Sequence, residues 1–284
     1  MRLARFSTGE RQGVGLVVDD AVFDVGSVIP SLPEVLGAGD AWLGGIARAR
    51  RRAPSYDLAE VELLPPIACP GKVLGIGLNY PAHAAEGGMT VPDVQMWFNK
   101  QNSCINGPYS PVHMPGVSTQ LDYEGELVVV IGRRGRHVPR ERALDHVAGY
   151  MVGNDLSVRD WQFRSPTTTI GKSFDTHGPI GPWITTRDEI PDPGDLQLRT
   201  YVNGEQRQAT STGDMVFSIP ELIEHLSTAF TLEPGDLLFT GTPDGVGLLM
   251  KPPGFLHVGD RVRVEIEGLG AIENEIVAEP RPEG

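Results

Sequence analysis

The chain has 284 residues, of which 40% are hydrophobic, and its formal net charge at pH 7 is −13. This length suits one large domain or a small domain joined to a larger one, and the hydrophobic content argues against a disordered chain. The acidic balance, with no basic face in the sequence, argues against a nucleic-acid partner. The 35 glycines and 24 prolines favour many short strands over a helical bundle.

The only two cysteines, Cys69 and Cys104, have no partner at metal-binding or redox spacing, so we interpret both as reduced thiols. The N-terminus, MRLARFSTGE, lacks the apolar core of a signal peptide. No apolar run approaches the length that spans a membrane. These features predict a soluble, cytoplasmic protein that does not contact a membrane.

The chain divides into residues 1–64, a small β-rich N-terminal domain, and residues 65–284, the main domain. In the first part, VGLVVDDAVFDVG (14–26) predicts a hairpin with Asp19 and Asp20 at its turn. A weak helix is predicted at 41–53. The proline-rich stretch LLPPIACPGK (63–72) is typical of a connector.

The main domain is predicted to be mixed and mainly β, with few helices. The two best helices are 81–86 and 218–230, and the second has one apolar face. The strongest strand candidates are 72–77, 126–132, 148–155, 181–185, 196–202, 237–240 and 261–267.

Three acids, Asp122, Glu124 and Glu126, open the stretch LDYEGELVVVIG (121–132), and the apolar run behind them predicts a buried strand. Alternate residues of a strand share a face, so Glu124 and Glu126 would stand roughly 7 Å apart along the chain. Two carboxylates this close, half out of water, need a proton or a cation between them. The alternative is a polar strand end that simply reaches solvent.

Asp155 ends another predicted strand, in GYMVGNDLSVRDWQ (149–162). An aspartate in this position is often only a turn former or a helix N-cap. Together with Glu124 and Glu126 it forms an all-oxygen set, which suits Mg²⁺, Mn²⁺ or Ca²⁺ better than zinc.

A histidine and a glutamate share one face of the first helix, in GIGLNYPAHAAE (75–86). Asn79 could cap this helix, and His83 and Glu86 would then lie at positions i and i+3, within contact distance. A carboxylate beside a histidine raises its basicity, as a general base requires. The pair could instead be an incidental surface contact, and a less favoured reading makes His83 a metal ligand.

Two further residues lie in glycine-rich turns. Lys172, in GKSFDTHGPIGPW (171–183), is either solvated or, beside a metal site, placed to balance an anionic substrate. Thr242, in FTGTPDGVG (239–247), lies in a loop whose amides and hydroxyl could hold a carboxylate, although the loop lacks a phosphate-binding pattern.

Over roughly residues 70–278 the chain resembles the fumarylacetoacetate hydrolase superfamily, specifically its smaller bacterial acylpyruvase and 2-hydroxyhepta-2,4-diene-1,7-dioate isomerase-like branch. The resemblance lies in motifs that occur in family order: GLNYPAHAAE, LDYEGELVVVIG, GYMVGNDLSVRDWQ, GKSFDTHGPIGPWI, MVFSIPELI and TGTPDGVG. Ile76 stands where the founding hydrolase has an additional aspartate ligand. This difference argues against the founding enzyme's substrate and favours the acylpyruvate-type branch.

The resemblance implies a β-roll of packed sheets with the site at its mouth, and a homodimer. It implies that Glu124, Glu126 and Asp155 bind Mg²⁺ or Mn²⁺, with Ca²⁺ as an in vitro substitute. It also implies that His83 and Glu86 activate water on a lid that orders over the substrate. It places Lys172, Arg159, Gln162 and Thr242 at substrate-contact positions.

We therefore expect a metal-dependent enzyme that acts on a small anionic 2-oxo acid through a metal-bound enolate stabilised by Lys172. Hydrolysis of the C–C bond of an acylpyruvate ranks first. Isomerisation of a 2-hydroxydienedioate and decarboxylation of oxaloacetate need the same enolate and remain open. So does a metal-dependent 2-oxo acid binding protein without turnover, although binding alone needs no base.

Overall fold

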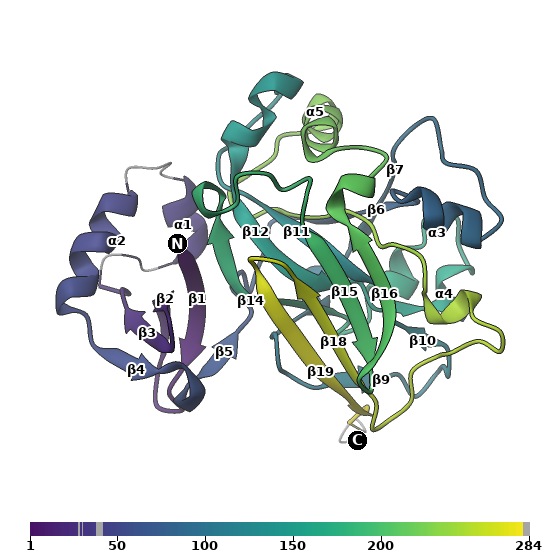
Figure 1. The fold of residues 1–284 in the computed structure, drawn as a ribbon, viewed down its shortest axis with the longest axis horizontal. Coiled ribbons are helices and arrows are strands. Elements are labelled where there is room, and N and C mark those ends of the chain that lie inside the picture. Colours follow the sequence, from purple (N-terminus) through teal and green to yellow (C-terminus); the bar gives the residue numbers. More distant parts are fainter. Residues whose placement is uncertain (28, 30, 38–41, 281–284) are drawn as a thin grey trace.

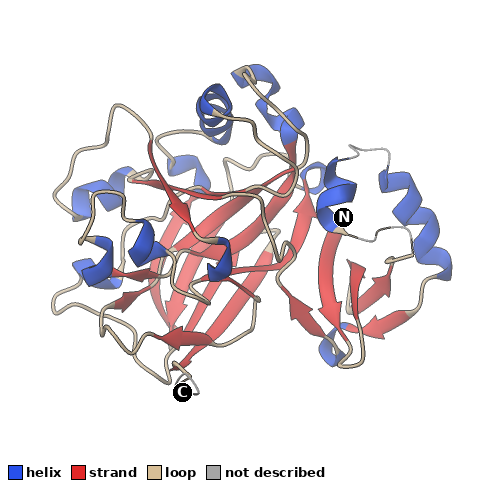
Figure 2. Cartoon of the chain, turned by 180° about the vertical axis from the view of Figure 1, so that it is seen from behind, coloured by secondary structure: helices blue, strands red, loops and turns tan. Residues whose placement is uncertain are grey.

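The computed structural model describes residues 1–27, 29, 31–37 and 42–280. Figure 1 shows a small N-terminal unit beside a larger body of packed sheets, with few helices at the periphery (Figure 2). The predicted fold class, mixed and mainly β with few helices, is therefore confirmed.

One large sheet runs through the molecule. In the described residues its main path has the order β4-β3-β2-β1-β14-β12-β11-β17-β6-β7, and β5 and β8 pair with β1 and β14 respectively. Its strands are β1 (Arg2–Ser7), β2 (Gln12–Val18), β3 (Ala21–Asp24), β4 (Ser55–Asp57), β5 (Glu62–Leu64), β6 (Val73–Gly77), β7 (Met96–Lys100), β8 (Ile105–Asn106), β11 (Gly125–Ile131), β12 (Val147–Asn154), β14 (Gly178–Thr186) and β17 (Leu237–Phe239).

The N-terminal unit joins this sheet through an antiparallel pairing of β1 with β14, in which Leu3 lies opposite Ile184. The predicted hairpin is confirmed, with β2 and β3 joined by a turn at Asp19 and Asp20. The proposed boundary at residue 64 falls at the end of β5, which pairs with β1.

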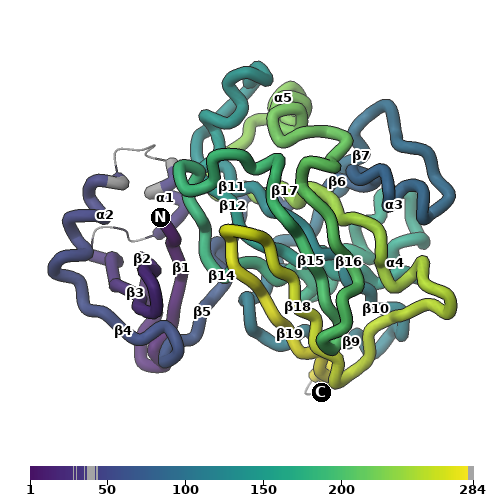
Figure 3. The backbone as a smooth tube through the Cα atoms, viewed as in Figure 1, coloured from purple at the N-terminus to yellow at the C-terminus, as the bar shows by residue number. Residues whose placement is uncertain are grey.

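A second sheet packs against the first. Its order is β16-β15-β18-β19-β9, and Figure 3 shows these strands crossing the front of the larger body. The strands are β9 (Val112–Met114), β15 (Gln197–Val202), β16 (Glu205–Ser211), β18 (Arg261–Ile266) and β19 (Gly270–Ala278), while β10 (Leu121–Asp122) and β13 (Ser157–Val158) form a separate pair.

The continuous apolar run of β11 is explained by burial on both of its faces. Leu127, Val129 and Ile131 belong to the core shared with the second sheet. Val128 and Val130 alternate with them and pack in the core that includes the N-terminal unit. A strand buried on both faces shows no polar alternation, so β11 forms a rigid central element of the fold.

Helices are short apart from α5 (Ile219–Ala229), which carries a capping box formed by Ser218 and Glu221. The others are α1 (Leu32–Gly37), α2 (Leu43–Ala49), α3 (Pro81–Glu86) and α4 (Arg159–Gln162). The helix expected at 41–53 is α2 followed by a 3-10 turn at 50–52, and position 41 lies outside the described residues. Within the described chain no helix is long and apolar enough to cross a membrane.

Candidate active site

The predicted acidic cluster forms because β11 and β12 are neighbouring antiparallel strands. Gly125 lies opposite Asn154, so the start of β11 and the end of β12 meet at one edge of the sheet. The backbone N–H of Asp155 donates to the carbonyl oxygen of Glu124 at 2.8 Å. This pairing places Glu124 and Glu126 beside Asp155, although Asp155 lies far from them in the sequence.

The three carboxylates offer ligand oxygens that all lie within 4.8 Å of one another. Their exposed fractions are 5% for Glu124, 1% for Glu126 and 0% for Asp155, which contradicts the alternative of acids wetted at a strand end. Burial, and then the charges of Asp155 and Glu124, raise the pKa of Glu126 well above its ordinary value. A buried, all-oxygen set with excess negative charge fits a divalent cation.

Lys172 reaches this cluster from a short 3-10 helix, Thr169–Lys172. Its Nζ atom lies 2.5 Å from Oε2 of Glu124 and 2.8 Å from Oδ2 of Asp155. Burial alone would lower the lysine's pKa, but these two carboxylates raise it above the ordinary value, so the ammonium form is favoured. Lys172 is 3% exposed, which contradicts the alternative of a solvated lysine.

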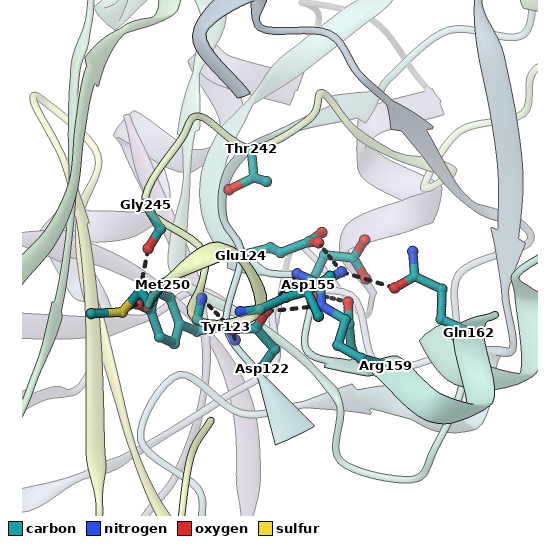
Figure 4. Close-up of polar contacts among 12 residues, drawn as sticks. Asp122, Tyr123, Glu124, Asp155, Arg159, Gln162, Thr242, Gly245 and Met250 are labelled. Atoms are coloured by element: carbon teal, nitrogen blue, oxygen red, sulfur yellow. Dashed lines mark hydrogen bonds and ion pairs between the residues drawn. The ribbon is translucent and has the colours of Figure 1, made fainter. Parts of the chain in front are cut away.

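Arg159, the first residue of α4, is buried among carboxylates (Figure 4). Its Nη2 atom lies 2.7 Å from Asp122 and its Nη1 atom lies 2.7 Å from Glu124. Burial alone would raise the pKa of Glu124, but the charges of Lys172 and Arg159 lower it to about 2. Arg159 Nη1 also donates to Oε1 of Gln162 at 2.9 Å, which orients the Gln162 amide.

Asp122 has a role that the sequence did not reveal. Besides Arg159, it accepts hydrogen bonds from the backbone N–H groups of Gly247 (2.8 Å) and Leu248 (2.9 Å). It therefore holds the 243–249 loop against the site. The acid was visible at the start of its strand, but its distant partners were not.

Glu126 accepts a hydrogen bond of 2.7 Å from the backbone N–H of Gly241. Gly241 has φ +97°, and a Cβ atom there would lie 2.8 Å from Cβ of Asn79, so only glycine fits. The expected helix cap at Asn79 is wrong, because Tyr80 is the N-cap and makes no side-chain cap. The Asn79 amide instead donates to the carbonyl oxygens of Phe217 and Thr240, which anchors the segment before α3.

His83 lies on α3 and lines the same cavity as Glu124 and Glu126. Its Nδ1 atom lies 3.9 Å from Oε2 of Glu86, which is longer than a hydrogen bond. Glu86 instead accepts from the backbone N–H of Gly245 at 2.9 Å and so fastens the helix to the opposite loop. Burial lowers the pKa of His83 despite the nearby charge of Glu124, so the neutral imidazole prevails near pH 7.

Thr242 also lines the cavity, but its hydroxyl has protein partners. It donates to the carbonyl oxygen of Gly125 at 3.0 Å and accepts from Nε2 of Gln208 at 2.9 Å. Gln208 also accepts from the Gly125 N–H, so it braces the start of β11. The sequence pattern of β16 gave no signal for this role.

Lys100 is a buried cation that the sequence analysis missed. Its Nζ atom lies 2.6 Å from Oδ1 of Asp155 and donates to the backbone carbonyl oxygens of Lys172 and His177. It thereby neutralises one carboxylate and fixes the backbone that carries Lys172. The last residue of a short strand is usually solvated, so its position alone gave no signal.

These groups surround one cavity of about 450 Å³. All nine predicted site residues lie at or beside it, although Glu86 and Asp155 contribute through Gly245 and the carboxylate cluster rather than to its lining. The cavity combines a buried carboxylate cluster that could hold a divalent cation, a neutral imidazole and the two anchored side chains Lys172 and Arg159. Such a set can bind an anion and move a proton next to a developing negative charge.

Comparison with known proteins gives one consistent result. Residues 72–277 match the family described as Fumarylacetoacetate (FAA) hydrolase C-terminal. The mitochondrial oxaloacetate tautomerase FAHD2A of Bos taurus is 41% identical over 288 residues, which cover 98% of this chain and 92% of that protein.

Two solved structures share the whole architecture. Maleylpyruvate hydrolase from Sphingobium sp. SYK-6, in complex with a manganese(II) ion and pyruvate, is 32% identical with a TM-score of 0.85, over 99% of this chain and 100% of that one. The 2-hydroxyhepta-2,4-diene-1,7-dioate isomerase of Mycobacterium marinum is 32% identical with a TM-score of 0.80, over the same shares.

Proposed function

The chain belongs to the fumarylacetoacetate hydrolase superfamily, in its smaller bacterial branch, and we propose that it hydrolyses the C–C bond of an acylpyruvate-type 2-oxo acid. The reaction depends on a divalent cation, Mg²⁺ or Mn²⁺, held by Glu124, Glu126 and Asp155. That ion would act as a Lewis acid toward negative charge that develops on the 2-oxo oxygen.

One observation carries the proposal. His83 lines the same cavity as the carboxylate cluster and is largely buried. Its Nδ1 atom has no hydrogen-bond partner in the described chain. A neutral, unpartnered imidazole is suited to take a proton from water. A protein that only bound 2-oxo acids would need no such base.

The residues divide the reaction between them. His83 accepts a proton from a water molecule whose oxygen forms a bond to C4, the distal carbonyl carbon. The C3–C4 bond then breaks, and its electron pair is delocalised from C3 onto the 2-oxo oxygen. Lys172 stabilises this charge, while Arg159 keeps Glu124 in place and orients Gln162. Return of the proton from His83 to C3 gives pyruvate, and C4 leaves as the carbon of a carboxylic acid.

A second candidate is keto–enol tautomerisation of oxaloacetate, which is favoured by the 41% identity to the bovine tautomerase. It requires a proton to move between C3 and the 2-oxo oxygen, and His83 can exchange that proton without a water attack. Oxaloacetate decarboxylation and 2-hydroxydienedioate isomerisation pass through the same enolate, so the same residues would serve those two reactions as well.

A substrate panel tests the proposal. Acetylpyruvate, oxaloacetate and a 2-hydroxydienedioate should be assayed with Mg²⁺, with Mn²⁺ and with EDTA, following pyruvate, CO₂ and the enol absorbance separately. Metal-dependent pyruvate release from acetylpyruvate supports hydrolysis. Enol conversion alone would move the assignment to tautomerase, and binding without turnover would make the protein a 2-oxo acid binder. The proposed homodimer is checked by sedimentation equilibrium of the same preparation.

A further inference from the structure

The residues that line the cavity fall into two groups that differ in their exposure to solvent. The charged residues at its base are almost fully buried, with Lys172 and Arg159 each 3% exposed. Three of the large apolar side chains that line it are much more open, with exposed fractions of 47% for Met89, 52% for Met96 and 67% for Phe163. We call Met89, Met96, Phe163, Leu248 and Leu249 the apolar rim.

Four separate segments supply this rim. Met89 follows α3, Met96 opens β7 opposite Gly77 of β6, and Phe163 follows α4. Leu248 and Leu249 belong to the loop that Asp122 holds through backbone bonds. Exposed apolar side chains from separate segments around one cavity mark a ligand site rather than chance exposure.

Neither lysine nor arginine of the lining is free to bind a charge at the rim. Among the described residues that line the cavity, the lysine and arginine side chains are Lys172 and Arg159. Lys172 is held by Glu124 and Asp155, and Arg159 by Asp122 and Glu124. A carboxylate placed at the rim would therefore gain no ion pair with the lining, and contact with the apolar side chains would remove part of its hydration.

The net charge at the base of the cavity also argues against a second carboxylate on the substrate. Four buried carboxylates (Asp122, Glu124, Glu126 and Asp155) face three buried cations (Lys100, Arg159 and Lys172). With a divalent cation bound and all four carboxylates ionised, the base would carry one excess positive charge. A substrate with a single carboxylate neutralises that charge, whereas a dicarboxylate leaves a net negative charge in a buried site.

From these observations we infer that the substrate of this site is a monocarboxylic 2-oxo acid whose group beyond the reacting carbons is apolar. The inference rests on the proposed function and deepens it. This substrate differs from the dicarboxylic substrates that the names of the bovine tautomerase and the SYK-6 hydrolase imply. Met96 and Phe163 are then specificity-determining residues that contact the distal group.

The first test measures binding with a matched pair of unreactive 2-oxo acids. In 5-methyl-2-oxohexanoate an isopropyl group replaces the distal carboxylate of 2-oxoglutarate, so the two have nearly the same shape. Calorimetry in Mg²⁺ should give a dissociation constant at least about tenfold lower for 5-methyl-2-oxohexanoate. The burial of each further methylene should tighten binding about fourfold. Equal or tighter binding of 2-oxoglutarate overturns the inference.

The second test measures turnover with the corresponding acylpyruvates, 4-methylpentanoylpyruvate and succinylpyruvate. Wild type should prefer the first in kcat/KM by at least about tenfold. The Met96→Lys variant should reduce or reverse that preference by supplying a cation at the rim, and Met96→Leu is the matched control that should retain it. Met96 is half exposed, so neither change threatens the core.

The outcomes distinguish the inferred apolar substrate from the proposed hydrolase activity. Pyruvate release from both substrates with a preference for succinylpyruvate overturns the apolar assignment and leaves the hydrolase standing. Tight binding of the apolar acid without any pyruvate release supports the apolar assignment and removes the hydrolase. Failure of the wild type to bind or turn over either compound overturns both.

Discussion

The ammonium group of Lys172 lies 2.5 Å from Oε2 of Glu124, so one side chain already provides positive charge to a predicted metal ligand. The lysine is therefore both a partner of the carboxylates and a competitor of any cation that binds them. This arrangement separates metal binding from catalysis, because the loss of Lys172 should affect the two in opposite directions.

Replacement of Lys172 with methionine should lower the dissociation constant for Mg²⁺ at least about tenfold, because a nearby positive charge is removed. Pyruvate release should fall, and oxalate binding should weaken, because the anion loses its cation partner. The metal-free variant should lose about 3–5 kcal/mol of unfolding free energy, since a buried cation is removed and Glu124 keeps only Arg159, and Asp155 only Lys100, as a cation partner. Calorimetry and urea unfolding measure these effects.

Lys251→Met, at an exposed lysine, is the control. Weaker Mg²⁺ binding in Lys172→Met would contradict the competition between Lys172 and the metal ion.

Glu126 is the carboxylate of the cluster that no lysine or arginine contacts in the described residues; its side chain accepts from the Gly241 N–H. Glu126→Gln keeps the shape of the side chain and removes a ligand charge, so Mg²⁺ binding should weaken by at least about 10–100-fold, the cost of losing a residue that only orients a ligand. The unfolding midpoint without metal should fall little, because burial already favours the protonated, neutral form of Glu126. An unchanged Mg²⁺ affinity would remove Glu126 from the metal site. Glu205→Gln, at an exposed position, is the matched control.

Replacement of His83 with alanine should lower kcat by about 10²–10⁴-fold, the usual size of a general-base effect. Mg²⁺ affinity should stay the same, because His83 is not among the clustered ligands. Calorimetry on the same preparation checks this. If the variant failed to bind Mg²⁺, His83 would have to be reassigned to the metal site.

The pH dependence of kcat/KM should show an acid limb whose midpoint lies below the ordinary histidine value of about 6.5. Burial disfavours the protonated imidazole of His83, so the neutral base persists to lower pH, and activity is lost only when the pH falls through that lowered pKa. The profile should be flat from about pH 7 upward until other groups titrate. An acid limb centred above 6.5 would point to a different base.

The sequence predicted those features of the fold and the site whose signal is local in the chain. The buried run of β11 and the apolar face of α5 predicted both elements, and the acids at one strand start and one strand end predicted the cluster. Contacts between distant segments were not predictable. Asn79 was expected to cap a helix but bonds to Phe217 and Thr240, more than a hundred residues away.

The same limit applies to the cations of the site. Lys100 ends an ordinary short strand, and only the folded sheet shows that it lies against Asp155. Glu86 was expected to orient His83, whereas the fold gives it a closer partner in the Gly245 N–H. Charged residues at element ends are usually solvated, so their burial follows from the packing rather than from the pattern.

The segment 78–95 is predicted to act as a lid that orders when an anion binds below it. It carries α3, ends that helix at Gly87, and turns at Gly88, whose φ of +66° favours glycine and makes the pair a plausible hinge. The Glu86–Gly245 hydrogen bond fastens the end of α3 to the opposite loop. One such bond contributes about 1.5–3 kcal/mol when one partner is charged, which allows frequent opening.

Oxalate is planar, chelating and anionic like the enolate of pyruvate, so as a mimic of the intermediate it should bind more tightly than pyruvate and close the lid. Hydrogen exchange across 78–95 should slow when oxalate is added to the Mg²⁺-loaded protein, while exchange in β11 stays unchanged. Glu86→Gln should raise exchange in the segment without oxalate, because the bond to Gly245 loses its charge. Equal protection of 78–95 with Mg²⁺ alone and with Mg²⁺ plus oxalate would make α3 a fixed part of the fold. His83 would then act from a rigid helix, and substrate would have to enter past the exposed apolar rim without any closure.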